Sequence, residues 1–277
     1  MLKAKSLTVA DVWSALFPLA KVRGKWIGLL CIGFSCAVFF FPGTPLTMMR
    51  ADLRAASGNH EGAVVLYDQV ANRGWSSGQR LLALRRSATL WSVALGVPDE
   101  SRRRLERYAI LVESPAERAR TWVRVGQSYS RFSHQPVYAA RSFQRAAENA
   151  STIDEKAAYQ LLAASSLSEA GQLKRATVLW DRVAKDSVTH RAAALIASGQ
   201  QSLRQGNAED ALGRFGDAVD AALMDDDRGL AKLGLAICLE RLGNLEGAIA
   251  EMDGADLPSE LRDVRVQAMQ ERKAQLH

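Results

Sequence analysis

The sequence predicts an all-α fold built from helix pairs that repeat along the chain. One observation is composition: only 7 of 277 residues are proline, while Ala, Leu, Arg and Glu, which lose little conformational freedom in helices, are abundant. The other is a short pattern that begins six times between residues 58 and 243. Hydrophobic residues at 48% and charged residues at 24% are typical of folded chains and argue against a disordered or polytopic membrane protein.

The repeated pattern is a glycine, an alanine five residues later, an aromatic residue after four more, and a small residue after another three. Its clear copies are Gly58, Ala63, Tyr67 and Val70; Gly171, Ala176, Trp180 and Val183; Gly206, Ala211, Phe215 and Ala218; and Gly243, Ala248, Met252 and Ala255. Its degenerate copies are Gly96, Ser101, Leu105 and Tyr108, and His134, Ala139, Phe143 and Ala146. Successive copies begin 35 to 38 residues apart, which is a spacing typical of helix-pair repeats.

Each position of the pattern has a physical role. The glycine follows the first helix of a pair and accepts the left-handed backbone conformation that other residues resist. The alanine lets helices approach closely, and the aromatic side chain fills the space between pairs, contributing about 1.5 to 3 kcal/mol when buried. Because one pair cannot cover its own apolar face, the pairs must stack, and the free end needs a polar cap.

The first helices of the predicted pairs carry a pattern of their own. It is most complete at Trp122, Val125, Gly126 and Tyr129, partial at Leu84, Ala88 and Trp91, and reduced to one small residue at Ala164, Gly199 and Ala236. With these motifs the chain resembles the tetratricopeptide repeat family, whose unit is a pair of antiparallel helices. The resemblance covers residues 44–257 and implies a solenoid of about six helical hairpins, followed by a polar capping helix at 258–277.

Residues 26–43 are expected to form a transmembrane helix, because Trp26 to Phe41 carries no charge and follows a basic stretch. Its 16 residues span about 24 Å of the roughly 30 Å hydrocarbon core, so Pro42 and Gly43 or local thinning must complete the crossing. Lys and Arg are more frequent before the segment than after it, which predicts a cytoplasmic amino terminus and an exported body, periplasmic in a bacterium. A buried soluble helix and a cleaved secretory signal are the alternatives.

Residues 1–25 form a basic segment whose apolar positions from Val9 to Ala20 predict an amphipathic helix. Such a helix lies on the lipids of the inner leaflet or binds a cytoplasmic partner. Within the apolar segment, Gly33 and Ala37 make a small-xxx-small pair, which offers a route to a homo-oligomer.

The sequence carries no pattern of an enzyme, a metal site or a cofactor site. No nucleotide-binding loop, nucleophile elbow or zinc-protease motif occurs. The histidines stand apart from one another and from any Cys or carboxylate at ligand spacing: His60, His134, His190 and His277. Asp225, Asp226 and Asp227 adjoin without the spacing of a calcium loop and predict a solvated turn.

Charge is divided unevenly along the chain. Of the net charge of +6, residues 1–25 carry +4, so the remainder is close to neutral and a nucleic-acid partner is not indicated. Residues 73–145 contain fourteen Arg and five acidic residues, whereas residues 206–263 contain five basic and fourteen acidic residues. This separation would steer an acidic ligand or anionic lipid toward the first stretch and a basic partner toward the second. Head-to-tail self-association is a third use.

Candidate partner-binding residues follow from the resemblance. In the register set by Trp122, the face that lines the groove of tetratricopeptide proteins carries Arg120, Gln127, Ser130 and Arg131. Arg124 on the same helix and Arg86 from the preceding repeat complete the set. By resemblance, such a groove holds an extended peptide or a partner helix, with arginine clamping a carboxylate.

A run of arginines precedes this helix. Arg102, Arg103, Arg104 and Arg107 fall on the second helix of a pair, where we expect them to be solvated or to face lipid head groups.

The function class that these observations favour is a non-enzymatic scaffold. We expect a single-pass protein of the bacterial inner membrane whose periplasmic repeats bind other proteins of an envelope machine, in secretion, surface-structure assembly or motility. The alternative is a periplasmic glycan-binding or polysaccharide-export accessory protein, in which arginine and aromatic side chains contact an acidic glycan.

Overall fold

The computed structural model describes residues 45–74, 76–253, 266–267, 269–271 and 274. Segment 1–25, the expected transmembrane helix at 26–43 and most of the expected capping helix at 258–277 lie outside these residues. No helix in the described part is long and apolar enough to cross a bilayer.

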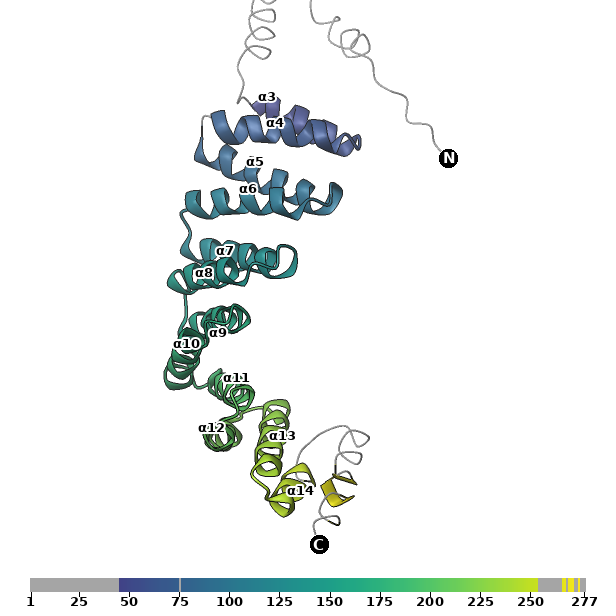
Figure 1. The fold of residues 1–277 in the computed structure, drawn as a ribbon. Helices are drawn as coiled ribbons and strands as arrows, with labels where there is room; N and C mark the ends of the chain where they lie inside the picture. The colour runs from purple at the N-terminus through teal and green to yellow at the C-terminus, as the bar shows by residue number, and fades with distance from the viewer. Residues whose placement is uncertain (1–44, 75, 254–265, 268, 272–273, 275–277) are drawn as a thin grey trace, which may run out of the picture. The chain divides into compact units, whose positions relative to one another are not determined.

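The predicted all-α fold of tetratricopeptide-like helix pairs is confirmed, since the described residues form successive helices and no strand (Figure 1). The helices are α3 (Pro45–Ala56), α4 (His60–Arg73), α5 (Ser77–Thr89), η2 (Leu90–Ala94), α6 (Pro98–Leu111), α7 (Pro115–Arg131), α8 (Pro136–Glu148), α9 (Ile153–Glu169), α10 (Leu173–Asp186), α11 (Arg191–Arg204), α12 (Ala208–Ala221), α13 (Asp225–Arg241) and α14 (Leu245–Asp253). Of these, η2 is a five-residue π-helix that directly follows α5 in the chain.

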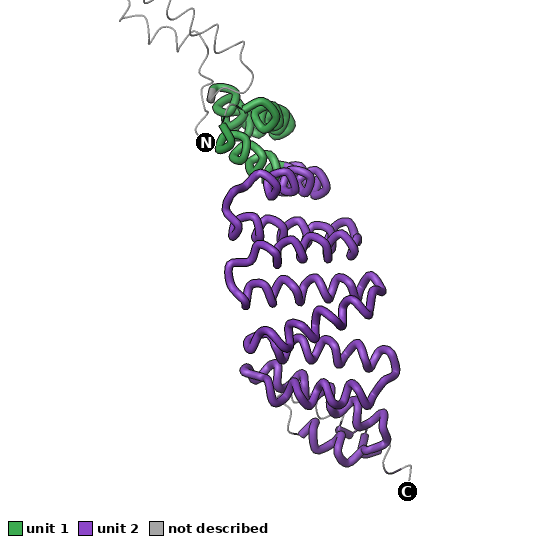
Figure 2. The backbone as a smooth tube through the Cα atoms, turned by 90° about the vertical axis from the view of Figure 1, so that its left-hand side faces the viewer, with its two compact units in different colours: residues 1–90 green, residues 91–277 purple. Residues whose placement is uncertain are grey.

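The helices fall into two compact units, residues 1–90 and residues 91–277 (Figure 2). In the first unit, α4 packs against both α3 and α5. In the second unit each helix from α6 to α13 packs against the next one in the chain, and α11 also contacts α13. The described part of the second unit therefore holds four complete stacked pairs, α7–α8, α9–α10, α11–α12 and α13–α14.

Helix starts follow local capping chemistry. The side chains of Asn59, Ser76, Ser114, Thr152 and Asn207 each accept a hydrogen bond from a backbone N–H in the first turn of the following helix. These bonds satisfy donors that a helix end would otherwise leave without a partner. At α6, α7 and α8 the first helical residue is proline, which has no N–H to satisfy.

The six glycine or histidine positions that begin the repeated pattern all adopt positive φ, between 47° and 84°. They are Gly58, Gly96, His134, Gly171, Gly206 and Gly243. Among the described residues His134 alone has positive φ without being glycine. Since a Cβ resists this conformation, its turn has the one strained backbone of the series.

The two degenerate copies of the pattern have wider turns than the others. After Gly58, Gly171, Gly206 and Gly243, the next N–H bonds to the carbonyl five residues earlier, as in Asn207 N to Ser202 O at 3.0 Å. After Gly96 and His134 the partner lies six residues earlier: Val97 N bonds Trp91 O at 2.8 Å, and Gln135 N bonds Tyr129 O at 3.1 Å. One extra residue is thus accommodated in each of these two turns.

The alanine and aromatic positions of the pattern are buried in each repeat. The alanines at 63, 139, 176, 211 and 248 are 0% exposed. The large side chains four residues later are at most 5% exposed: Tyr67, Leu105, Phe143, Trp180, Phe215 and Met252. The predicted register of the second helices is therefore confirmed.

Glycines of the first helices make room for these rings. A Cβ on Gly126 in α7 would lie 2.7 Å from Phe143 Cε1 in α8, and one on Gly199 in α11 would lie 3.1 Å from Phe215 Cζ in α12. A Cβ on Gly234 in α13 would clash with the same Phe215 ring. A side chain at position 126 or 234 would therefore displace a ring, and one at position 199 would require the Phe215 ring to shift slightly.

Met269, within the region expected to cap the repeats, is 2% exposed. It packs with Ala236 of α13 and with Ala248 and Met252 of α14. An apolar side chain from beyond α14 thus covers part of the last pair, which would otherwise face water.

Replacing His134 by glycine should stabilise the second unit by about 1 kcal/mol, because glycine adopts positive φ without the clash that a Cβ causes. The His134 side chain is exposed, so little packing is lost. Urea unfolding followed by circular dichroism measures the change. An unchanged or lower midpoint for His134→Gly would mean that the histidine side chain contributes an interaction of its own.

Candidate interaction surface

The six predicted partner-binding residues divide between the two units. Arg86 lies on α5 in the first unit, whereas Arg120, Arg124, Gln127, Ser130 and Arg131 lie on α7 in the second.

Arg86 is engaged inside the first unit. Its guanidinium forms an ion pair with Asp52 of α3, and the Tyr67 hydroxyl of α4 donates a hydrogen bond to the same carboxylate. Burial and the bond to Asp52 raise the pKa of Tyr67 to about 12, and the bond to Asp52 raises the pKa of Arg86. The geometry thus assigns Arg86 to a link among α3, α4 and α5.

A cleft of about 180 Å³ on the second unit brings three of the predicted residues together. Arg124, Gln127 and Arg131 lie on one wall, at the i, i+3 and i+7 positions that share a helix face. The remaining lining residues are Ser128 of α7; Pro98, Ser101 and Leu105 of α6; Ser92 of η2; and Phe132, which directly follows α7. We call this the arginine cleft.

Two predicted residues of α7 do not line the arginine cleft. Ser130 is half-buried. Arg120 is exposed and lies near Tyr159 of α9. Burial raises the pKa of Tyr159, and the positive charge of Arg120 opposes part of that rise. The sequence register of α7 alone did not find Phe132 or the α6 residues. Whether the α6 residues line the cleft depends on which face of α6 packs beside α7, and no sequence motif indicates that face.

Arg124 and Arg131 are exposed, and neither makes an ion pair or side-chain hydrogen bond with a described residue. Phe132, beside them, is 62% exposed, although it is a large apolar side chain. Leu105, 5% exposed, and Pro98 add apolar surface from α6. The arginine cleft therefore combines two uncompensated cations with an apolar edge, which suits an acidic ligand that also carries an apolar group.

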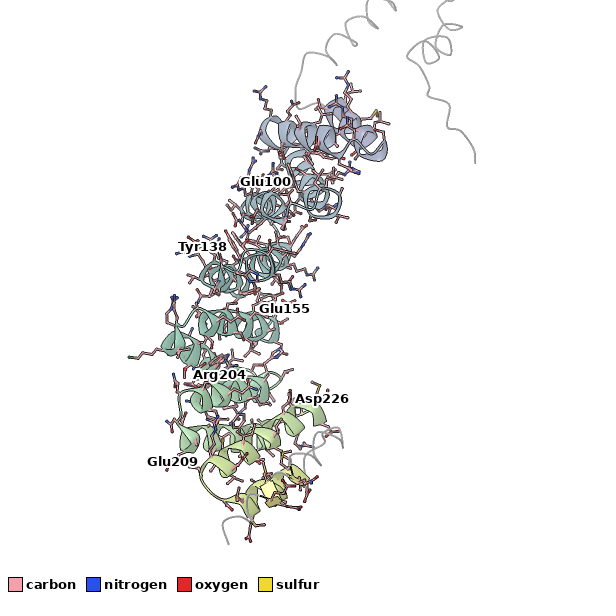
Figure 3. The ribbon with its side chains drawn as sticks, turned by 45° about the vertical axis from the view of Figure 1, so that its right-hand side comes forward. Glu100, Tyr138, Glu155, Arg204, Glu209 and Asp226 are labelled. Atoms are coloured by element: carbon pink, nitrogen blue, oxygen red, sulfur yellow. The ribbon has the colours of Figure 1, made fainter. Side chains whose placement is uncertain are left out.

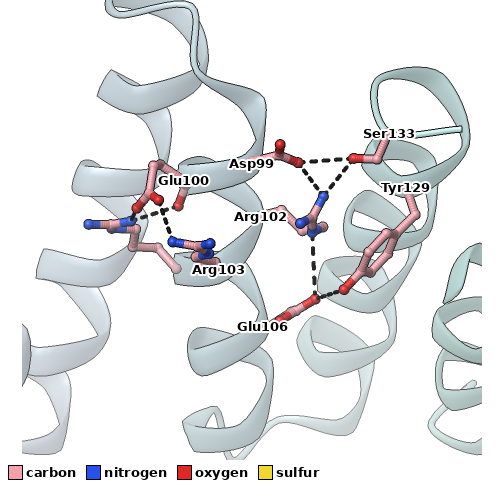
Figure 4. Close-up of polar contacts among 8 residues, drawn as sticks. Asp99, Glu100, Arg102, Arg103, Glu106, Tyr129 and Ser133 are labelled. Atoms are coloured by element: carbon pink, nitrogen blue, oxygen red, sulfur yellow. Dashed lines mark hydrogen bonds and ion pairs between the residues drawn. The ribbon is translucent and has the colours of Figure 1, made fainter. Parts of the chain in front are cut away.

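Arg102 fixes α6 beside α7 (Figure 4). Its Nη1 donates to Asp99 Oδ1 at 2.5 Å and to Ser133 Oγ, in the α7–α8 turn, at 2.8 Å. Its Cζ lies 4.1 Å from the centroid of the Tyr129 ring, and the Tyr129 hydroxyl donates to Glu106 Oε1 at 2.7 Å. Because the cluster ties α6 to the last turn of α7 and to the turn that follows it, it holds α6 and α7, the two helices that line the arginine cleft, together at that end.

The expectation that the arginine run of α6 is solvated or faces lipid is wrong for two of its members. The side chains of Arg102 and Arg104 are only 11% and 14% exposed, and both are paired with acidic residues. Arg104 also lies over the Trp91 ring, with its Cζ 5.1 Å from the centroid. Arg103, 67% exposed, fits the expectation. Helical spacing turns consecutive arginines to different sides, so the run does not share one environment.

The acidic triplet at 225–227 is also placed differently from the expected turn. Asp225, Asp226 and Asp227 form the first turn of α13, where the partial positive charge of the helix end favours carboxylates. Within the described residues, no group of three or more His, Cys, Asp or Glu side chains is arranged to hold a metal ion.

No family model and no curated protein matches the sequence. Among solved structures it is similar to YrrB, a TPR protein with an unusual peptide-binding site, at 20% identity over 72% of this chain and 95% of that one, with a TM-score of 0.45. PilW, a type IV pilus biogenesis factor, is 16% identical over 76% of this chain and 90% of its own, with a TM-score of 0.45.

A third similar structure is the apo form of the quorum sensor NprR from B. thuringiensis. It is 14% identical, with 94% of this chain and 74% of that one covered and a TM-score of 0.45. At these identities the likeness concerns the helical-repeat fold alone.

Replacing Arg102 by alanine should destabilise the second unit by about 2 kcal/mol, because Asp99, Ser133 and the Tyr129 ring lose a shared cationic partner. Arg103→Ala is the matched control on the same helix, and its exposed ion pair predicts a change within about 0.5 kcal/mol. Urea midpoints of the two variants test the difference. Equal midpoints would show that the Arg102 cluster does not hold α6 to the α7–α8 turn.

Proposed function

We propose that this protein is a non-enzymatic interaction scaffold whose arginine cleft binds an acidic peptide segment of a partner protein. The observation that carries the proposal is the pair Arg124 and Arg131, two exposed guanidinium groups on one helix face without an ion-pair partner among the described residues. By contrast, Arg102, Arg103 and Arg104 of α6, one helix away, form ion pairs. A carboxylate at the cleft would therefore gain charge-assisted hydrogen bonds without displacing an internal partner.

The shape and lining of the cleft narrow the class of ligand. Gln127 lies between the two arginines and offers an amide donor and acceptor to a peptide backbone. Phe132 presents an exposed ring at the edge, so a ligand residue next to the acidic one gains by being apolar. An extended segment with aspartate or glutamate beside leucine or phenylalanine meets these requirements.

The wider setting of the proposal comes from the sequence. The uncharged stretch Trp26 to Phe41 and the basic residues before it favour an inner-membrane anchor with the repeats in the periplasm. Partners would then be proteins of the bacterial cell envelope, in an assembly for secretion, surface structures or motility. An acidic glycan is the alternative ligand, because arginine and an exposed aromatic ring also suit it.

Charge reversal tests the proposal. In the full-length protein, kept in mild detergent, Arg124→Glu with Arg131→Glu should weaken binding of a fluorescent peptide containing alternating Glu and Leu by at least about 10-fold, since each lost charged hydrogen bond costs about 1.5–3 kcal/mol. The control double variant Arg141→Glu with Arg182→Glu makes the same change in net charge at exposed positions on α8 and α10, outside the cleft. Its affinity should stay within about twofold of wild type.

Three outcomes decide the matter. Loss confined to the cleft variant supports the peptide site. Equal losses in both double variants would show that the peptide responds only to overall charge, which contradicts the proposal. Cleft-dependent binding of a polygalacturonate oligomer, with no binding of the peptide, would replace the peptide by the glycan alternative.

A further inference from the structure

The second unit carries another groove, which shares no residue with the arginine cleft. It lies among α10, α11 and α12 and has a volume of about 650 Å³. That volume falls within the roughly 300–1,000 Å³ typical of ligand sites. We call it the α12 groove, because α12 supplies half of its lining residues.

The centre of the α12 groove is held by Arg214. Its guanidinium donates to Asp181 Oδ1 of α10 at 2.8 Å, to Asp210 Oδ2 of α12 at 2.9 Å, and to Ser198 Oγ of α11 at 2.8 Å. Hydrogen bonds from Ser202 and Arg214 hold the pKa of Asp210 below its usual range. Arg214, Asp181 and Asp210 therefore satisfy one another, and they join the three helices that form the walls.

Two carboxylates remain on the α12 wall. Glu209 and Asp217 are exposed and make no ion pair or side-chain hydrogen bond with a described residue. With Gly213 they occupy the i, i+4 and i+8 positions, so acid, glycine and acid follow one another along one helix face. Figure 3 shows Glu209 at the start of α12, on the same side of the second unit as Tyr138.

Gly213 has no packing reason to be glycine. A Cβ built on it meets no atom within 4 Å, unlike those on Gly199 and Gly234, which would press on the Phe215 ring. Glycine inside a helix costs about 1 kcal/mol relative to alanine. Gly213 lines the groove and has no neighbouring side chain to accommodate, although it lowers the stability of the helix. Its missing side chain leaves space for the backbone of a bound chain to approach α12.

The α10 and α11 residues that line the groove add the opposite charge. Lys185 of α10 and Arg191 of α11 line the groove, are exposed, and form no ion pair with a described residue. An occupant of the α12 groove therefore meets two carboxylates from α12 and two cations from α10 and α11, none of them in an ion pair with a described residue.

We propose that the α12 groove binds an extended peptide segment with two basic side chains four residues apart and an acidic side chain between them. Glu209 and Asp217 are eight residues apart on a helix, about 12 Å along its axis. In an extended chain, side chains at i and i+4 point to the same side and lie about 13 Å apart. The two basic side chains, at i and i+4 of the peptide, thus reach Glu209 and Asp217, and the backbone between them passes over Gly213. An acidic side chain at i+1 or i+3 points away from α12, toward Lys185 and Arg191.

This site goes beyond the proposed function, because it adds a second ligand of different charge pattern. Residues 206–253 contain eleven acidic and four basic residues, so the field around α12 attracts a segment whose ends are basic. The arginine cleft selects an acidic segment instead. A chain with both sites would join two different partners, and either site can fail without the other.

The test exploits the glycines of α12. Gly213 lines the groove, whereas Gly216 on the same helix does not, and a Cβ at either position would meet no atom within 4 Å. Gly213→Ala and Gly216→Ala should both raise the thermal midpoint of the full-length protein, because each removes a glycine from a helix interior. Only Gly213→Ala should weaken binding of a fluorescent peptide Gly-Lys-Glu-Gly-Glu-Lys-Gly, by about 10-fold, because its methyl group occupies the space of the peptide backbone.

Charge variants complete the test. Glu209→Gln with Asp217→Asn should reduce binding of the same peptide by at least about 10-fold, whereas Arg124→Glu with Arg131→Glu should leave it unchanged. A peptide of identical composition with adjacent lysines should bind more weakly than the probe. The proposal is overturned if the wild type does not bind the probe, or if Gly213→Ala binds it as well as Gly216→Ala does.

Discussion

The contact between an aromatic ring on a second helix and a small residue on a first helix is the constraint on which the rest of the structure depends. Phe215 shows it most fully, because its ring lies against Gly199 of its own pair and against Gly234 of the next. One side chain therefore fixes the separation within a pair and between pairs. Phe143 against Gly126 does the same within α7–α8, and the α6–α7 contact that forms the arginine cleft is built on that pair.

Much of this arrangement could be predicted from the sequence, because the residues that create it recur along the chain in a fixed order and spacing. The six turn positions, the buried alanines and the large residues behind them all followed from one spaced pattern. Gly234 was missed, because it lies two residues before Ala236, which fits the expected small position better. The six-residue turns at Gly96 and His134 were missed because their hydrogen bonds join backbone atoms and leave no side-chain signature.

The binding surface was less predictable than the fold, because the sequence does not show whether a charge already has a partner. Arg102 and Arg124 look alike in the sequence, yet the first is held among Asp99, Ser133 and Tyr129, and the second is exposed without a described partner. The difference arises from the neighbouring helix. Arg86 illustrates it again, since its partner Asp52 lies 34 residues earlier in the chain. Composition located the basic stretch, while packing decided which of its members remain available.

The longer turns at Gly96 and His134 have a consequence for how such a chain is recognised. Ala139 and Phe143 stay buried after the turn at His134, so the additional residue is absorbed in the connection and leaves the core unchanged. Equivalent residues therefore keep equivalent buried positions in the structure, while the number of residues between them in the sequence varies. A template of constant repeat length falls out of phase after one or two units of this chain, even though the buried positions of each unit remain equivalent. At these two turns the extra residue is thus accommodated between the helices of a pair.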